Sequence, residues 1–166
     1  MLSEKTILKI CNIIVSFAFA ICFAFTINYV FLFQVKQQGF SMAPYINDRS
    51  VVFVNRLYRN VFKLKRHDVI AFYTNGQTSL KRIYGMPGET VVITNGEFYI
   101  DGEKLTDENL KKSLSSNIEQ NVTVKDNEYY VLGDNLDSSK DSRFVDVGNV
   151  KKEDIIGKVW LILKQK

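Results

Sequence analysis

"ITNGEFYIDGEKL", residues 93–105, contains two tight-turn signals in close succession. The pairs Asn95-Gly96 and Asp101-Gly102 each lie between apolar segments that are rich in β-branched and aromatic residues. Asn-Gly and Asp-Gly are the dipeptides that two-residue β-hairpin turns prefer, because both turn residues adopt a positive φ. The stretch therefore predicts short antiparallel strands joined by tight turns.

The segments on both sides of this stretch continue the strand pattern. Short runs rich in β-branched and aromatic residues occur at 50–54, 68–73, 90–94, 98–100, 129–132 and 155–163. The stretch 105–127 is polar, and we expect it to form a short helix or a mobile loop inserted between strands. The sequence predicts a mostly β fold for the domain over residues 34–166.

A different pattern precedes this domain. Residues 10–33 form a run of 24 residues without a charge. At about 1.5 Å per residue, a helix of this length reaches about 36 Å, enough to cross a hydrocarbon core of about 30 Å. A cleavable secretory signal has an apolar region of only about 7 to 15 residues, and the Ala-x-Ala pattern at 18–20 lies in the middle of the run. We therefore expect a single transmembrane helix and a lipid bilayer as partner.

The charges beside this run suggest its orientation. Lys5 and Lys9 precede it, and Lys36 alone follows it closely. The positive-inside rule then favours a cytoplasmic N-terminus, residues 1–9, and a β domain on the extracytoplasmic face of the cell membrane. Both cysteines, Cys11 and Cys22, lie within the run, so the β domain cannot depend on disulfides or cysteine-rich zinc sites.

The overall charge excludes one class of partner. The 166 residues carry 22 Lys and Arg against 18 Asp and Glu, a net charge of +4. Outside the first 35 residues the two signs are interspersed rather than gathered into a basic run. No nucleic-acid partner is expected, because such a partner requires a basic stripe or patch.

A serine stands just beyond the apolar run. The stretch "QGFSMAPYI", residues 38–46, places Ser41 in a turn before Pro44. Taken alone, such a serine is usually a turn residue, and a nucleophilic serine needs a base. The single histidine, His67, is followed directly by Asp68 at the start of a predicted strand, where adjacent side chains point to opposite faces. The two cannot form a triad with the serine, and a lone histidine does not support a metal site.

The remaining candidate base is a lysine. In "SLKRIYGMPGE", residues 79–89, Lys81 lies in an apolar, strand-like context; the alternative is an ordinary solvated lysine on a strand. A third stretch, "YYVLGDNLDSSKDSR" at 129–143, is a strand that runs into a loop of Asp, Asn and Ser. It is not an EF-hand calcium loop, because Lys140 stands where the sharp turn needs glycine. Its alternative interpretation is a turn that hydrogen-bonds to itself.

Together, in this order and behind a membrane span, the three stretches resemble bacterial type I signal peptidases, in their compact Gram-positive form. The most specific parts are "GFSMAP", "KRIYGMPGE" and "GDNLDSSKDSR". The resemblance covers residues 35 to 160 and implies the mostly β signal-peptidase fold. It also implies an endopeptidase that needs neither a cofactor nor a metal and removes signal peptides from exported pre-proteins.

The resemblance also implies roles for individual residues. Ser41 matches the nucleophile and Lys81 the general base. Ser139 matches the hydroxyl that positions the lysine, and Asp141 with Arg143 match a supporting ion pair. The residues that match the substrate cleft are Phe40, Met42 and Pro44. Gly39 lies at the oxyanion site but carries no side-chain donor, so the second donor beside the Ser41 N–H stays open; glycine there would allow close approach of the backbone.

The chemistry implied is acyl transfer at a serine. A neutral lysine takes the serine proton during attack on the scissile carbonyl and returns it to the leaving amine, and water then hydrolyses the ester. Two other functions are compatible with parts of the sequence. One is a non-proteolytic, membrane-anchored relative that assists assembly of a surface-fibre protein. The other is a cytosolic Ser/Lys autopeptidase of the repressor type, which the apolar run and the absence of a DNA-binding segment disfavour.

Overall fold

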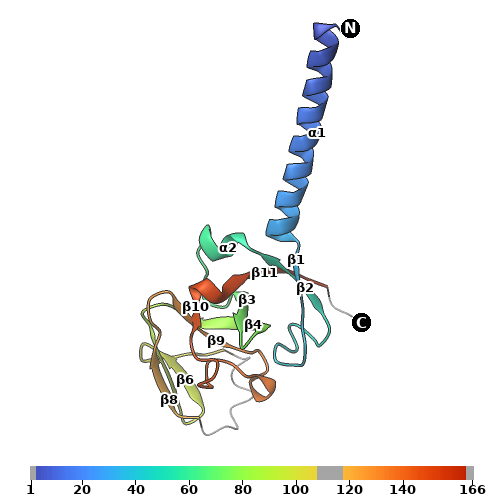
Figure 1. Cartoon of the computed structure of the whole chain (residues 1–166). Helices are drawn as coiled ribbons and strands as arrows, with labels where there is room; N and C mark the ends of the chain where they lie inside the picture. The colour runs from blue at the N-terminus through green and yellow to red at the C-terminus, as the bar shows by residue number, and fades with distance from the viewer. Residues whose placement is uncertain (1–2, 108–117, 164–166) are drawn as a thin grey trace.

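The N-terminal helix and the β domain are separate parts of the molecule. The structure, a computed structural model, describes residues 3–107 and 118–163. Helix α1 (Glu4–Phe31) projects away from the β domain as one rod with the N-terminus at its far end (Figure 1). It begins at Ser3, whose hydroxyl accepts a hydrogen bond from the Thr6 N–H, as an N-cap residue does.

The helix is long and apolar enough to cross a membrane. Its mean hydropathy over the most apolar window is 2.4, and none of that window is buried against protein. The helix is shifted relative to the predicted span of 10–33, because it starts six residues earlier and ends at Phe31. Phe33, expected in the span, instead begins strand β1 and packs against the core of the β domain.

Two antiparallel sheets form the β domain, which is mostly β as the strand pattern predicted. The larger sheet has the order β1-β2-β11-β3-β4-β9-β10. Its strands are β1 (Phe33–Lys36), β2 (Val51–Asn55), β3 (Val69–Thr74), β4 (Gln77–Gly85), β9 (Glu128–Leu132), β10 (Val150–Lys151) and β11 (Ile155–Leu163). The smaller sheet has the order β7-β6-β5-β8. It contains β5 (Thr90–Thr94), β6 (Glu97–Ile100), β7 (Glu103–Lys104) and β8 (Gln120–Thr123).

Short helices connect some of these strands. They are α2 (Leu57–Asn60) after β2, the 3₁₀ turn η1 (Leu136–Ser138) after β9, and the 3₁₀ turn η2 (Lys152–Asp154) before β11. The two predicted turns are present: Asn95-Gly96 joins β5 to β6, and Asp101-Gly102 joins β6 to β7, with positive φ at all four residues. The predicted strands occur within one residue of their expected bounds.

Apolar side chains fill both faces of the larger sheet. Strand β3 illustrates this, because Val69 and Ala71 pack in one apolar cluster while Ile70 and Phe72 pack in another. Successive strand residues point to opposite faces, so β3 must be covered on both sides. A third cluster, around Tyr84 and Tyr130, packs against the smaller sheet. These clusters hold the centre of the larger sheet, including β4, in a fixed position.

The prediction for 105–127 was partly wrong. Residues 120–123 form strand β8, which pairs with β5 in antiparallel register. The reason is that this edge strand has only two partly buried positions, Gln120 and Val122, and its other side chains are polar and exposed. A strand of this kind has little apolar signal in the sequence. Residues 108–117 lie outside the described residues.

Candidate active site

Ser41 lies in a turn that the first two strands hold in place. Beyond β1, the pairing with the β2 side continues: the Gln37 N–H donates to the Ser50 carbonyl at 2.9 Å, and the Gln37 carbonyl accepts from the Arg49 N–H at 3.0 Å. The Gly39 N–H donates to the Asp48 carboxylate at 2.7 Å. These bonds fix the backbone immediately before Ser41.

Gly39 is explained by its backbone conformation. Its φ is +78°, a region that side-chain-bearing residues rarely adopt. No atom lies within 4 Å of the position that a Cβ would take. The space beside Gly39 is therefore open, and close approach of the backbone at the oxyanion site stays a prediction.

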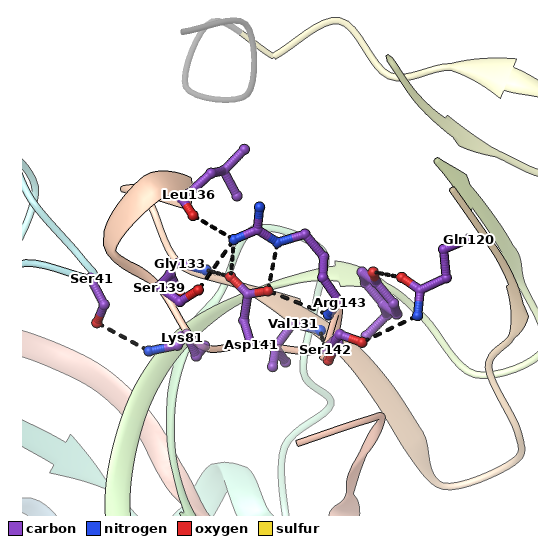
Figure 2. Close-up of polar contacts among 11 residues, drawn as sticks. Ser41, Lys81, Gln120, Val131, Gly133, Leu136, Ser139, Asp141, Ser142 and Arg143 are labelled. Carbon is purple, nitrogen blue, oxygen red and sulfur yellow. Dashed lines mark hydrogen bonds and ion pairs between the residues drawn. The ribbon is translucent and has the colours of Figure 1, made fainter. Parts of the chain in front are cut away.

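Lys81 points from strand β4 directly at the serine. Its Nζ donates to Ser41 Oγ at 3.0 Å (Figure 2). It also donates to the Leu80 carbonyl at 3.1 Å. Only 5% of the Lys81 surface is exposed. Burial lowers the pKa of Lys81; the negative charges of Asp141 and Asp134 oppose this effect, and the positive charge of Arg143 adds to it. The side chain is thus closer to the neutral form than a solvated lysine is.

The loop after β9 supports this pair from the other side. The Asp141 carboxylate accepts from the Gly133 N–H at 3.0 Å and from Arg143 Nε at 2.8 Å (Figure 2). Arg143 also donates to the carbonyls of Leu136 at 2.6 Å and Ser139 at 3.3 Å. Both charged side chains are almost fully buried, so the predicted ion pair is present and ties the loop together.

The same loop packs against the backbone of Ser41. The Asn135 N–H donates to the Ser41 carbonyl at 3.0 Å. A Cβ on Gly133 would lie 2.4 Å from that carbonyl oxygen and 2.2 Å from Ser139 Oγ. Ser139 is buried, and its hydroxyl has no hydrogen-bond partner within residues 3–107 and 118–163. Ser139 therefore lies beside the pair without bonding to Lys81.

A cleft of about 470 Å³ opens at Ser41 and Lys81. Strand β1 lines one wall and residues 77–81 of β4 line the other. β1 is at the edge of the larger sheet, and β9 pairs with β4 only from Arg82 onward. Each wall therefore presents a strand edge that lacks a strand partner among the described residues. An extended peptide can bind such edges through its main chain.

The three residues that the resemblance assigns to the substrate cleft lie outside its lining. Phe40 and Pro44 are exposed, and Met42 is fully buried in the core with Val35 and Ile46. None of the three belongs to the lining of the cleft. His67 is also absent from the lining of the cleft: it precedes β3, and its Nδ1 lies 3.8 Å from the Asp107 carboxylate.

One residue of the site was not anticipated. Gln37 is only 4% exposed, and its Nε2 donates to Ser41 Oγ at 3.3 Å. A signal for it exists in the sequence: in "FQVKQ", residues 33–37, the inward positions of the strand are Phe33, Val35 and then Gln37. Inward positions of a strand are usually apolar, so a polar side chain at such a position indicates a specific role.

The described residues contain no cluster suited to a metal ion. Within residues 3–107 and 118–163, no three His, Cys, Asp or Glu side chains are arranged to coordinate one. The polar groups that meet at Ser41 are its own hydroxyl, the Lys81 amine and the Gln37 carboxamide. Such groups suit proton transfer and acyl transfer at a serine.

The family relationship follows from sequence comparison. The family model for signal peptidase, peptidase S26, matches residues 10–164. Signal peptidase I T of Bacillus subtilis is 32% identical over an alignment of 172 positions, which covers 93% of this chain and 88% of that protein. A signal peptidase I of Bacillus amyloliquefaciens is 34% identical over 114 residues, 63% of this chain and 62% of that protein.

A solved structure supports the same relationship. The crystal structure of a signal peptidase I from Enterococcus faecalis superposes with a TM-score of 0.52 at 34% identity, and the match covers 61% of this chain and all of the solved chain. The mostly β fold and the apolar N-terminal helix agree with this similarity. Because the family model matches almost the whole sequence, the chain belongs to the signal peptidase family, peptidase S26.

Proposed function

We propose that this protein removes signal peptides from exported pre-proteins, with Ser41 as nucleophile and Lys81 as general base. The observation that carries the proposal is the contact of 3.0 Å between Lys81 Nζ and Ser41 Oγ, made by a buried lysine at the mouth of a cleft. Membership of a peptidase family supports the same activity. The non-proteolytic assembly role finds no support in the comparisons.

The reaction begins with neutral Lys81. In that state the Ser41 hydroxyl donates to Nζ, and the amine takes the proton as Oγ forms a bond to the scissile carbonyl carbon. The oxyanion requires preorganised donors, and the Ser41 N–H is the first of these. Lys81 then delivers the proton to the leaving amine, which departs as the new N-terminus. Water hydrolyses the resulting ester with Lys81 again as base.

The supporting residues keep this pair in position. Asp141 and Arg143 hold the loop that covers Lys81, and the Ser139 hydroxyl, which is buried beside the site, is the hydroxyl we propose to orient the lysine amine during the reaction. Phe40, Met42 and Pro44 shape the turn around Ser41 and influence substrate fit through it. In this proposal the substrate lies extended between β1 and β4, with its apolar segment in the bilayer beside α1.

The orientation of the chain completes the proposal. With the N-terminus in the cytoplasm and α1 across the membrane, the β domain lies on the extracytoplasmic face. Ser41 follows the end of α1 by ten residues. The nucleophile is then near the membrane surface from which a translocated signal peptide emerges.

The decisive experiment is cleavage of a pre-protein by the purified full-length chain in detergent. Ser41→Ala and Lys81→Ala should each lower kcat by at least about a thousandfold, and the double variant should be hardly worse, since the two side chains act as a unit. Circular dichroism should show that each variant stays folded. Lys125→Ala, at an exposed position away from the cleft, is the control and should cleave normally.

Two results would contradict the proposal. Substantial turnover by Lys81→Ala would exclude lysine as the base. Absence of cleavage by the wild-type protein, combined with stable binding of the pre-protein, would instead support the assembly role.

A further inference from the structure

Gln37 is a buried polar side chain that contacts Ser41 Oγ and for which the proposed mechanism has no use. It follows β1, and its main-chain N–H and carbonyl are both hydrogen-bonded, to Ser50 and Arg49 respectively. The side chain is almost fully buried at 4% exposure, and it lines the same cleft as Ser41 and Lys81. A buried carboxamide is retained in a protein when its polar atoms have partners, so its contacts indicate its role.

The contacts of Gln37 converge on the nucleophile. Its Nε2 lies 3.3 Å from the Gln38 carbonyl and 3.2 Å from the Gly39 carbonyl. It also lies 3.3 Å from Ser41 Oγ. The two carbonyls identify this end of the carboxamide as the NH₂ group, because an amide oxygen would face two other oxygens there. The group beside the serine oxygen is therefore a donor.

Ser41 Oγ thus has two nitrogen neighbours with different chemistry. Lys81 Nζ accepts the hydroxyl proton when the amine is neutral, whereas the Gln37 NH₂ group can only donate. A hydrogen bond donated to Oγ occupies an oxygen lone pair and leaves the O–H free to point at Lys81. As the proton moves to Lys81, negative charge develops on Oγ, and a hydrogen bond to a charged oxygen is about twice as strong as one to a neutral oxygen.

We propose that Gln37 is a catalytic residue of this reaction: its side-chain NH₂ group donates to Ser41 Oγ, directs the hydroxyl proton to Lys81 and stabilises the charge that develops on Oγ during attack. This inference rests on the proposed roles of Ser41 and Lys81. The interaction is stronger in the transition state than in the ground state, so its loss should lower kcat rather than raise KM.

The test compares two substitutions of Gln37 in the full-length protein. Gln37→Met keeps the length of the side chain and removes the donor. Its kcat should fall by about tenfold to a hundredfold, the range for a hydrogen bond to a charged group, while KM stays within about twofold. The pH midpoint of kcat, which reports Lys81, should not move.

Gln37→Glu provides a second signature. It keeps the shape of the side chain but presents a carboxylate beside the oxygen that Lys81 contacts. A negative charge there favours protonated lysine, so the pH midpoint of kcat should move upward. Asp141, Asp134 and Arg143, which already act on the charge of Lys81, are unchanged in this variant. A purely structural effect of residue 37 would not leave the midpoint unmoved in Gln37→Met and raise it in Gln37→Glu.

The matched control is Gln120→Met. Gln120 is a partly buried glutamine; it accepts from the Tyr130 hydroxyl at 2.6 Å, and it donates to the Ser142 carbonyl at 3.4 Å (Figure 2). It lies in β8 and not in the cleft lining, so its substitution should lower stability and leave kcat unchanged. Thermal melting followed by circular dichroism gives the folded fraction of every variant.

The outcomes separate this inference from the proposed function. A wild-type kcat in Gln37→Met, a loss confined to KM, or an equal loss in Gln120→Met would each overturn the role of Gln37. If Gln37→Met does not fold, Gln37→Glu decides the question. A wild-type kcat together with an unchanged pH midpoint of kcat in that variant would also overturn the role of Gln37. Equal cleavage by wild type and Ser41→Ala would instead overturn the proposed function itself.

Discussion

Lys81 combines two properties that oppose each other in most proteins, because it is ionisable and almost completely buried. Its pKa is lowered by burial, which the carboxylates of Asp141 and Asp134 only partly offset. A lysine with a lowered pKa is a more effective base near neutral pH, since more of it is unprotonated. The burial that suits it for proton transfer should reduce the stability of the folded domain.

Lys81→Met should therefore make the protein more stable while abolishing cleavage. Between the lowered pKa and the ordinary value of 10.5, the unfolded chain binds more protons than the folded chain, so the free energy of unfolding of the wild type rises with pH. Below the lowered pKa the folded state carries the full cost of the buried charge. The advantage of Lys81→Met should be largest at acid pH and shrink toward pH 10.5.

Melting curves of both proteins at several pH values measure this effect. Each unit by which the pKa is lowered corresponds to about 1.4 kcal/mol, and each kcal/mol moves the Tm of a protein of this size by about 2 to 4 °C. Arg59→Met, at an exposed position, serves as the control for replacing a cation by methionine. A Tm difference that does not change with pH would show that burial of the charge is not its cause.

At the scale of elements, the site depends on the contact between the loop after β9 and the turn that carries Ser41. Gly133 is the point of closest approach, because a Cβ there would lie 2.4 Å from the Ser41 carbonyl oxygen and 2.5 Å from Ser139 Cβ. Neither atom is at the free end of a flexible side chain. A methyl group would therefore separate the two segments.

Gly133→Ala should lower kcat by more than about tenfold even below its melting temperature, because the displacement reaches both Ser41 and Ser139. Gly157→Ala is a matched control. Its Cβ would lie 2.3 Å from the Asn55 carbonyl oxygen, at the pairing of β2 with β11, so it should destabilise the fold in a similar way. Steady-state kinetics should be measured at a temperature where both variants are folded. Equal kcat in the two variants would show that the contact at Gly133 does not affect catalysis.

The cleft between β1 and β4 predicts which substrates are accepted. An extended peptide between these strands turns every second side chain toward the same wall, so the residue before the scissile bond and the one two positions upstream share a surface. That surface includes Val35 and Leu80, which are buried and held in the core. Only small side chains should fit against it.

Pre-proteins that differ only at those two positions test this. Ala, Ser or Gly should be cleaved, and Leu, Phe or Lys should be cleaved at least about tenfold more slowly, because overfilling a packed site costs about 1 to 3 kcal/mol. The control is a pre-protein with Leu one residue upstream of the second of these two positions. The side chain there faces away from the wall. Equal rates for the Ala and Leu versions would exclude a small pocket.

At the scale of the whole molecule, the end of α1 is bonded to the β domain rather than joined by a free linker. The Arg56 N–H donates to the Val30 carbonyl at 3.0 Å, and Trp160 Nε1 donates to the Phe31 carbonyl at 2.9 Å. The Arg56 guanidinium lies 4.0 Å from the centre of the Phe33 ring. These contacts satisfy carbonyls at the helix end that would otherwise lack partners, and they place the cleft at the end of α1.

Cysteine labelling on intact cells tests the proposed orientation. In a variant with Cys11 and Cys22 replaced by Ala, Lys125→Cys puts one thiol on the exposed surface of the β domain, and Lys5→Cys puts one near the start of α1. A membrane-impermeant maleimide should label position 125 on intact cells and position 5 only after lysis. The reverse pattern would place the β domain in the cytoplasm.

The sequence by itself determined the elements that depend on near neighbours along the chain. The apolar run of 10–33 predicted a helix, and the Asn-Gly and Asp-Gly pairs predicted the hairpins, because periodicity and turn conformation act over a few residues. Strand β8 was missed because an exposed edge strand has almost no apolar pattern. The sequence placed the end of the helix at Phe33, whereas α1 ends at Phe31. An apolar residue such as Phe33 fits a membrane helix as well as a strand, and only its packing against the core selects the strand.

The tertiary structure decided how the site is assembled. Ser41, Lys81 and the loop up to Arg143 are far apart in the chain, so only their resemblance to a known family suggested that they belong together. Their contact depends on β1 pairing with β2, on β4 lying between β3 and β9, and on Gly133 allowing two segments to touch. Gln37 shows the same limit: alternation along β1 marks it as inward-facing, but its contact with Ser41 arises because strand pairing closes the turn between them.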